Sequence, residues 1–300
     1  MSDLDQALAE LPDPLRSQAR EWAEEYLQQV GQPLSAAVRQ SLPRVFAVSE
    51  FVVRCCLREP ALLPALEGQD LLIQPDQPGG VRERLEACLH AVADADALSR
   101  ELRRFRRHEM VRIAWRDLAG WASLQETLAD LSALAGACTE AALTRLYAWL
   151  SKAWGIPRNQ LGEPQQLVVL GMGKLGGEEL NFSSDIDLIF AFPETGSTDG
   201  ERSKSNEEFF TTLGRQLIAA LDAPTAEGFV FRVDMRLRPY GNSGPLAMSF
   251  NALETYYQSQ GREWERYAMV KARVIAGDRV RGAQLLETLR PFVYRRYLDY

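Results

Sequence analysis

The chain has 300 residues, enough for about two domains, and its 46% hydrophobic and 25% charged residues are typical of a globular protein. Its net charge of -7 argues against nucleic acid as the main partner, because binding a phosphate backbone requires a basic surface. No stretch approaches about 18 uncharged apolar residues, and the N-terminus carries acids where a signal peptide carries bases, so we expect a cytoplasmic protein without a membrane partner.

The first half of the chain has apolar residues at helical spacing. Asp13 and Pro14 predict a helix N-cap followed by a proline in the first turn. A second helical stretch starts near Pro33, with a break expected at Pro43. The turn-rich segment QPDQPGG, residues 74–80, separates these stretches from two longer helical ones.

The helical half contains all four cysteines and a dense basic run. No cysteine belongs to a CxxC pair, which predicts reduced thiols in place of a zinc site or a disulfide framework. We expect the basic run to form a salt-bridged helix surface, the alternative being a contact with an anionic partner. Its members are Arg103, Arg104, Arg106 and Arg107.

Strand-like patterns begin only near residue 166. The apolar run LVVLG, residues 167–171, predicts a buried strand that ends at glycine, and DIDLIFAF, residues 185–192, predicts a second strand. A polar loop and an amphipathic helix follow. The segment FVFRVDMRLRP, residues 229–239, predicts a third strand, and the sequence from SFNALETYYQ at residue 249 onward predicts helix.

Asp185 and Asp187 give the first chemical signal. Side chains at i and i+2 of a strand share a face, so these two carboxylates lie side by side while Ile186 and Leu188 pack on the other face. Adjacent carboxylates repel each other unless a cation lies between them, and ligation by oxygen alone selects Mg²⁺ or Mn²⁺. A solvated strand face with incidental acids is the alternative for an isolated pair.

The third predicted strand offers partners for these acids. Its alternation places one acid and three arginines on a single face: Arg232, Asp234, Arg236 and Arg238. If this strand neighbours the second one, Asp234 joins Asp185 and Asp187 in one cluster. The acid would complete a metal site, and the guanidinium groups would bind phosphate oxygens. Two metal ions held there could bridge the attacking and leaving oxygens of an in-line displacement.

A glycine-rich segment, GMGKLGGEELNFSS, separates the first two strands, and its glycines allow a backbone to approach phosphate closely. It matches GxGxxG after a strand, but only about seven residues lie between Gly177 and Asp185, too few for the crossover helix of a dinucleotide-binding fold. The P-loop pattern fails too, because Lys174 is followed by Leu175 in place of Ser or Thr.

The order of apolar strand, Gly-Gly, short helix and acid-x-acid strand, with a third acid later, resembles the DNA polymerase β-like nucleotidyltransferases. The segments LGMGKLGGEELNFSSDIDLIF, FRVDMRLRPYGNSGPL and QGREWERYAMVKARVIAGD resemble, more narrowly, the bifunctional glutamine synthetase adenylyltransferase/adenylyl-removing enzymes. That family has two nucleotidyltransferase domains in one long chain. The motifs here are similar to those of the N-terminal domain. The resemblance extends from about residue 100 to the end of the chain.

The resemblance implies an α+β fold in three regions. Residues 1–160 would form a helical N-terminal region, 161–250 a nucleotidyltransferase (polymerase β-like) core with a mixed sheet, and 251–300 further helices. The chain stops at RPFVYRRYLDY without a cap or a polar tail, so we expect it to be a piece of a longer protein.

The resemblance also implies an activity: metal-dependent phosphorolytic removal of AMP from an adenylylated tyrosine of glutamine synthetase, which yields ADP and the active synthetase. In the family, the PII signalling protein controls the balance between removal and addition of AMP. Two alternatives stay open, namely forward adenylylation from ATP and a non-catalytic regulatory module, although the presence of all three acids disfavours the module. The residues alone do not separate the two directions of AMP transfer.

The resemblance assigns the metal and catalytic roles to Asp185, Asp187 and Asp234, with two Mg²⁺ or Mn²⁺ ions as cofactors. The candidates for binding nucleotide or phosphate are Gly176, Gly177, Ser184, Lys174, Arg236, Arg238 and Lys271. Three further arginines, Arg262, Arg266 and Arg273, have spacings of 4 and 7 residues. They predict one basic helix face, which is either solvated or at the mouth of the phosphate pocket.

Overall fold

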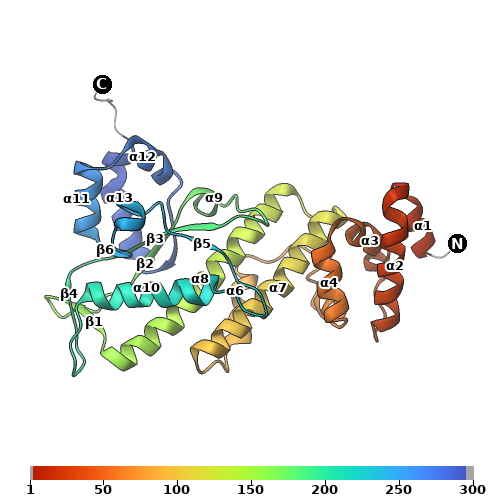
Figure 1. The fold of residues 1–300 in the computed structure, drawn as a ribbon, viewed down its shortest axis with the longest axis horizontal. Coiled ribbons are helices and arrows are strands. Elements are labelled where there is room, and N and C mark those ends of the chain that lie inside the picture. Colours follow the sequence, from red (N-terminus) through yellow and green to blue (C-terminus); the bar gives the residue numbers. More distant parts are fainter. Residues whose placement is uncertain (1–2, 295–300) are drawn as a thin grey trace. The chain divides into compact units, whose positions relative to one another are not determined.

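The computed structural model describes residues 3–294 (Figure 1). Two compact units divide the chain: Met1–Gly80 with Phe105–Leu131, and Val81–Arg104 with Ser132–Tyr300. Their boundaries differ from the three ranges expected from the sequence, because two long helices each contribute residues to both units. The expected functional ranges stay a prediction.

The first unit is helical. Its elements are α1 Asp3–Ala9, α2 Asp13–Gln29, α3 Ala36–Val48, α4 Glu50–Arg58, α5 Leu62–Glu67, the later part of α7 Ala95–Ala119 and the start of α8 Leu124–Trp154. Helix α2 has Pro12 as its N-cap, so the prediction of an Asp13 cap was wrong by one residue. The break predicted at Pro43 was also wrong: α3 continues through it and ends at Ser49, whose side chain accepts the N–H of Val52 and caps α4.

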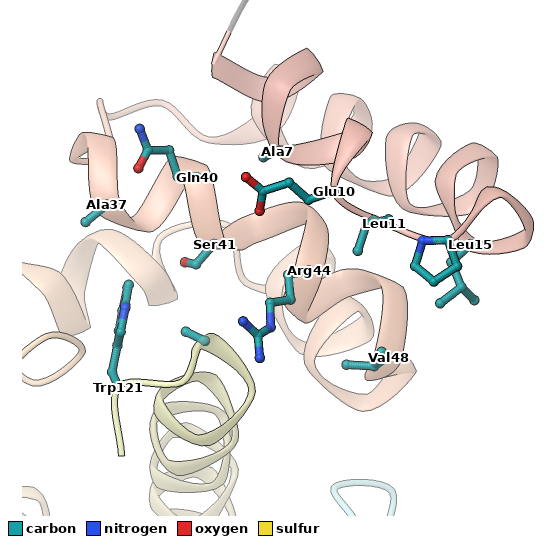
Figure 2. A pocket seen from close by; sticks show the side chains of 12 residues that line it. Ala7, Glu10, Leu11, Leu15, Ala37, Gln40, Ser41, Arg44, Val48 and Trp121 are labelled. Carbon is teal, nitrogen blue, oxygen red and sulfur yellow. The ribbon is translucent and has the colours of Figure 1, made fainter. Parts of the chain in front are cut away.

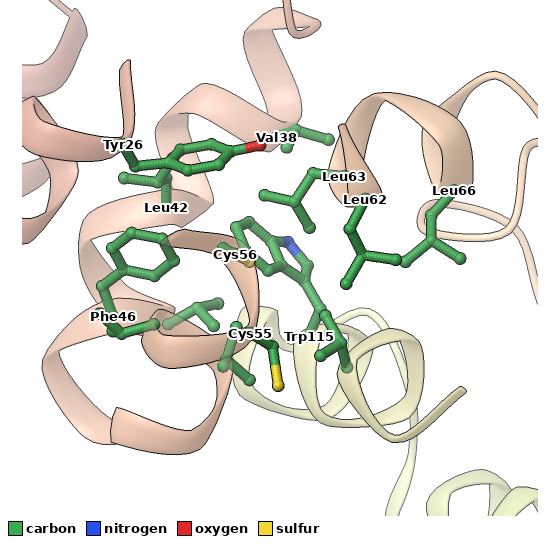
Figure 3. Close-up of a cluster of buried hydrophobic side chains, with 14 of the residues drawn as sticks. Tyr26, Val38, Leu42, Phe46, Cys55, Cys56, Leu62, Leu63, Leu66 and Trp115 are labelled. Carbon is green, nitrogen blue, oxygen red and sulfur yellow. The ribbon is translucent and has the colours of Figure 1, made fainter. Parts of the chain in front are cut away.

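An aromatic and aliphatic core holds these helices together (Figure 3). The Phe46 ring lies edge-on to Tyr26 at 5.8 Å and to Trp115 at 6.1 Å between centroids. The indole N–H of Trp115 donates to the Ser41 hydroxyl at 3.0 Å, which satisfies the one polar group of a buried ring. All four cysteines lie in helices and are free thiols, and Cys56 belongs to this core.

The second unit contains the sheet. Its helices are α6 Gly80–Leu89, α9 Gly173–Gly176, α10 Asn206–Asp222, α11 Phe250–Ser259, α12 Glu263–Met269 and α13 Arg279–Val293, besides parts of α7 and α8. Its strands are β1 Pro157–Asn159, β2 Val168–Gly171, β3 Ile186–Phe192, β4 Gly196–Thr198, β5 Val233–Asp234, β6 Ala247–Ser249 and β7 Arg273–Gly277. The main sheet has the order β5-β3-β2-β7, with β6 also paired to β3, and β1 pairs with β4. The predicted α+β class is confirmed.

Strand β3 is apolar on both faces because helices cover both (Figure 1). Ile189 and Ala191 pack with residues of α11 and α13. On the other face, Phe192 stacks on Phe210 of α10 with centroids 4.9 Å apart. A side chain at Gly214 of α10 would meet the Phe190 ring at 2.8 Å, so this glycine allows the helix to approach the sheet. These contacts fix the strand that carries the candidate acids.

The third predicted strand is much shorter than residues 229–239. Only Val233–Asp234 pairs with the sheet. The side chain of Asp234 accepts the backbone N–H of Arg236 at 2.8 Å, and the N–H of Arg238 then donates to the Met235 carbonyl at 3.2 Å. These local bonds compete with ladder bonds and turn the chain away. The predicted common face of Arg232, Asp234, Arg236 and Arg238 therefore ends at Asp234.

Three other sequence predictions were wrong. Residues 273–277 form β7 and not helix, because Val274 and Ile275 are β-branched and the segment pairs with β2. Arg273 therefore does not share a helix face with Arg262 and Arg266. Strand β1 precedes residue 166, where strands were expected to begin.

Arg103 is buried and does not belong to a salt-bridged surface. Its guanidinium donates to the carbonyl of Gly228 at 2.8 Å and to that of Ser99 at 2.8 Å, and it also reaches the carbonyl of Ala223. It thereby connects α7 to the segment after α10 within the second unit. Arg104, at an exposed position, follows the prediction and pairs with Glu101 at 3.1 Å.

Candidate functional site

The three candidate acids come together at the β3–β5 pair. The two strands are parallel, and Asp187 stands directly opposite Asp234 in the register. Because paired residues project to the same face of a sheet, the two carboxylates are neighbours. Asp185 lies two residues earlier, just before β3 begins. The strand pairing thus brings Asp234 beside Asp187, and the expected site formed by all three acids stays a prediction.

Two of the three acids have arginine partners. Asp234 accepts from Nε of Arg236 at 2.7 Å, and Asp185 accepts from Nε of Arg232. Arg232 also donates to the Ser183 carbonyl at 2.9 Å, so its guanidinium fixes the approach to β3. The hydrogen bond from the Arg236 side chain is the main reason why the pKa of Asp234 lies below its ordinary value.

Asp187 differs from both neighbours. In the part of the chain that the structure describes, no ion pair or hydrogen bond is formed by its carboxylate, which is half-buried between the other two acids. Burial raises the pKa of Asp187, and the negative charges of Asp234 and Asp185 raise it further. The charge of Arg236 opposes this rise without cancelling it, so a further cation beside Asp187 would stabilise its carboxylate.

The chemistry of this donor set fits a hard divalent cation. The three carboxylates, two of which pair with arginines, offer the oxygen ligands that Mg²⁺ and Mn²⁺ prefer. Among residues 3–294, however, no three acidic, histidine or cysteine side chains converge closely enough to hold one ion as they stand. The hydrogen bonds above give the reason, since Asp185 and Asp234 face Arg232 and Arg236. Holding an ion would require these two carboxylates to turn toward Asp187.

The glycine-rich turn lies beside the acids. Gly173 begins α9 with φ of +53°, and a Cβ placed on it would be 3.2 Å from an oxygen of Asp187. The N–H groups of Gly176 and Gly177 donate within the turn, to Met172 at 3.0 Å and Gly173 at 3.1 Å. Their expected role in binding phosphate stays a prediction, and it would have to use other amides or close backbone approach.

Gly176 is required for packing. A Cβ at this position would lie 2.0 Å from the Lys271 carbonyl oxygen, so only glycine lets the turn contact the segment before β7. Arg273 on β7 completes the contact by donating to the carbonyls of Gly176 at 3.1 Å and Leu175 at 3.0 Å. Sequence reasoning placed Arg273 on a helix and missed this role, which the β-branched pattern around it could have indicated.

The remaining candidates surround the turn and the segment after β5. Lys174 is exposed, with its ammonium 3.5 Å from the Ser184 hydroxyl, and Lys271 pairs with Glu179 at 2.6 Å. Arg238 donates to the carbonyls of Met235 and Asn242, so its guanidinium braces a loop. Arg232, which was not among the predicted site residues, contacts a candidate acid directly.

A separate pocket of about 560 Å³ lies in the first unit (Figure 2). Helices α1, α2 and α3 and the end of α7 form its walls, with Glu10, Arg44 and Trp121 among the lining side chains. None of the predicted site residues lines it. The candidate site residues therefore lie around the acids of the second unit and not in this cavity.

The arrangement defines a class of protein. A small mixed sheet has one acid on a strand, a second just before that strand and a third on its parallel neighbour, beside a glycine-rich turn. This is a nucleotidyltransferase-like fold preceded by helices. A family model described as glutamate-ammonia ligase adenylyltransferase matches residues 39–288. The chain belongs to this family.

Curated relatives agree. The chain is 58% identical over 259 residues to a protein of Pseudomonas aeruginosa, covering 86% of this chain and 26% of the relative. It is 55% identical over 261 residues to one of Thioalkalivibrio sulfidiphilus (87% and 27%) and 49% identical over 292 residues to one of Hahella chejuensis (96% and 30%). All three relatives are named bifunctional glutamine synthetase adenylyltransferase/adenylyl-removing enzyme. The chain thus spans between a quarter and a third of their length.

Within residues 3–294, no helix is long and apolar enough to cross a membrane.

Proposed function

We propose that this chain catalyses the removal of AMP from an adenylylated tyrosine of glutamine synthetase, with inorganic phosphate as the acceptor. The observation that carries the proposal is the unpartnered, half-buried carboxylate of Asp187 between Asp185 and Asp234. The family and the names of the relatives supply the substrate class. The wording of the motifs, which resembles the adenylyl-removing copy, supports removal over addition.

The reaction balances without a further reactant. A phosphate oxygen attacks the phosphorus of the AMP group, the bond between phosphorus and the tyrosine oxygen breaks, and ADP forms. The tyrosine leaves as a phenolate and then takes up a proton from water. Because a phenol has a pKa of about 10, this leaving group needs less help from a general acid than an alkoxide would.

The acids would hold one or two divalent ions. Bound Mg²⁺ or Mn²⁺ would neutralise charge that develops on the phosphoryl oxygens. Asp187 would be the central ligand, joined by Asp185 and Asp234 after they turn from their arginines. The freed guanidinium groups of Arg232 and Arg236 would then bind phosphate oxygens of the two reactants. Lys174, on the exposed side of the turn, would add a further positive charge.

Forward adenylylation from ATP is the second candidate, because the names of the relatives include both activities. The same acids would serve it, with the synthetase tyrosine as the nucleophile and diphosphate as the leaving group. The two directions differ in the small anion that the site must accept.

One assay separates them. The chain is incubated with adenylylated glutamine synthetase, Mg²⁺ and phosphate, and ADP is followed over time. We expect ADP release that requires phosphate and disappears in Asp187→Asn, while Asp222→Asn at the end of α10 keeps the wild-type rate. Labelling of unmodified synthetase from ATP, without phosphate-dependent ADP, would reverse the direction. If neither reaction is detected, the non-catalytic regulatory module is the function that remains.

A further inference from the structure

Tyr240 has an unusual backbone conformation for a bulky residue. Its φ of 60° and ψ of 10° place it in the left-handed region, which glycine or asparagine adopts more readily. A conformation of this kind is strained for a residue with a side chain and persists only where the surroundings impose it. The residue is nevertheless 48% exposed, so burial does not explain the conformation.

The loop around Tyr240 imposes the conformation from two sides. Arg238 braces the loop by donating to Met235 on one side at 2.7 Å and to Asn242 on the other at 3.4 Å. A Cβ on Gly244 would lie 2.0 Å from the Pro239 carbonyl oxygen, so the loop closes tightly on itself.

Helix α11 fixes the base of the ring. The Tyr256 ring lies edge-on to the Tyr240 ring, with centroids 4.5 Å apart. The Tyr256 hydroxyl donates to the buried carboxylate of Glu265 at 2.8 Å. One part of the Tyr240 ring is therefore held by Tyr256, and the exposed part is held still in front of solvent.

The loop that carries Tyr240 starts where β5 ends, at the candidate acid Asp234. The Asp234 carboxylate accepts the backbone N–H of Arg236. Further along the loop, a Cβ on Gly241 would lie 3.7 Å from the Arg236 carbonyl oxygen. Gly241 thus lies near the backbone of the arginine that contacts Asp234, and Tyr240 directly precedes Gly241 in the chain. A rigid, half-exposed aromatic ring in the loop that follows Asp234 and Arg236 has the features of a platform for a nucleobase, because every base presents a flat face for stacking.

We propose that Tyr240 is the platform on which the purine base of the adenylyl group stacks, and this inference rests on the proposed function. The strained backbone turns the ring outward, and Tyr256 sets its plane. The class of ligand is an adenine nucleotide whose phosphates lie toward Asp187 and whose base lies over Tyr240.

The test compares a ligand that has a base with one that lacks it. Binding of ADP and of inorganic diphosphate is measured by calorimetry in the presence of Mg²⁺, for the wild-type chain and for Tyr240→Gly. Glycine suits the left-handed backbone, so the loop keeps its path while the ring is lost. We expect ADP to bind roughly tenfold more weakly, the usual effect of removing a stacking partner, and diphosphate to bind as before. Tyr240→Phe should keep the wild-type affinity for ADP.

Tyr267→Ala is the matched control, because this tyrosine on α12 is 72% exposed and belongs to the same unit. An ADP affinity in Tyr240→Gly no lower than in this control would overturn the platform. A wild-type chain that binds ADP no more tightly than diphosphate would overturn it too. If Tyr240→Gly leaves ADP binding intact but raises the KM for the adenylylated synthetase, the ring contacts the protein substrate and the platform is wrong.

The proposed reaction fails separately. A chain that binds ADP through Tyr240 but shows no phosphate-dependent release of ADP from the adenylylated synthetase keeps the base subsite and loses the reaction. A chain with that release, but with equal ADP affinity in wild type and Tyr240→Gly, keeps the reaction and loses the base subsite.

Discussion

Each compact unit contains a group of arginines paired with acids, and the two groups differ in exposure. In the first unit, the side chains of Arg112 and Glu109 are 1% and 3% exposed and pair at 2.7 Å. In the second unit, Arg236 is 73% exposed although its partner Asp234 is only 13% exposed. Separating a buried guanidinium from its acids would produce unpaired charges that water cannot solvate. An exposed guanidinium can exchange its carboxylate partner for a phosphate.

The buried group stabilises the first unit. Arg112 contacts Asp130 at 2.8 Å and Asp76 at 3.8 Å besides Glu109, and Arg116 pairs with Glu126 at 2.5 Å. Arg116 also donates to the carbonyls of Leu72 and Gln74, which hold the turn-rich segment. The same residue types thus stabilise a fold in one unit and offer movable charge in the other. The predictions below test this difference.

The largest effect on stability is expected from Arg112→Ala. It leaves three acids without their shared cation in a buried site, which typically costs about 3–5 kcal/mol. Chemical unfolding of the first unit should detect it. In the control Arg54→Ala, an exposed pair with Glu50 on α4 is removed, and the change should stay within about 0.5 kcal/mol. Equal effects of the two substitutions would show that burial does not distinguish the pairs.

Asp187→Asn should have the largest effect on activity and little on stability. Removing a central metal ligand should lower kcat by at least about 100-fold, comparable to the loss of other transition-state charge stabilisation. The melting temperature should stay the same or rise, because the pKa of Asp187 is raised by burial and by neighbouring acids, so its charge opposes folding. Near-wild-type turnover in this variant would remove Asp187 from the site.

Gly176→Ala should disturb the turn next to the acids. The added Cβ would lie 2.0 Å from the Lys271 carbonyl oxygen, and forced overpacking costs typically about 1–3 kcal/mol. Gly136→Ala is the matched control, because this glycine lies in α8 with no atom within 4 Å of an added Cβ. That substitution should stabilise the protein by up to about 1 kcal/mol. A neutral result at Gly176 would contradict the close contact.

The smallest of these effects should be a dependence of the protein's stability on pH. The pKa of Asp130 lies above its ordinary value of 3.8, because burial outweighs the attraction of Arg112, which it shares with two other acids. An acid with a higher pKa in the folded protein binds more protons when folded, so stability falls as the pH rises from about 3.8 through the raised value. Asp130→Asn should lack this fall.

Melting temperatures measured from pH 4 upward check this prediction. Asp70→Asn, at an exposed position of the same unit, should keep the wild-type profile. A wild-type stability that rises over the same window relative to Asp130→Asn would show that Arg112 outweighs burial.

Patterns with a clear period could be predicted from the sequence. The helical first half, β2 and β3 follow from apolar spacing. The pairing of Asp187 with Asp234 was expected only on the condition that their two strands are neighbours, which the structure shows. The length of the third strand could not be predicted, since the Asp234 side chain captures the Arg236 N–H and ends the ladder. Residue alternation gives no warning of such a local bond.

The roles of single arginines were also beyond the sequence. Arg103 lies in a basic run that predicts a surface, yet its position against backbone carbonyls after α10 buries it. Arg273 braces the glycine turn because β7 pairs with β2, a contact about a hundred residues apart in the chain. Long-range pairing decides which arginines are structural and which are free to bind an anion.

Binding of Mn²⁺ tests most directly whether the acids of β3 and β5 form a cation site. Free Mn²⁺ is followed by electron paramagnetic resonance as the purified chain is added, for the wild type, for Asp187→Asn and for the control Asp222→Asn. We expect the wild type and the control to bind Mn²⁺ alike and Asp187→Asn to bind it at least about tenfold more weakly. Equal Mn²⁺ affinity in all three proteins would contradict the account.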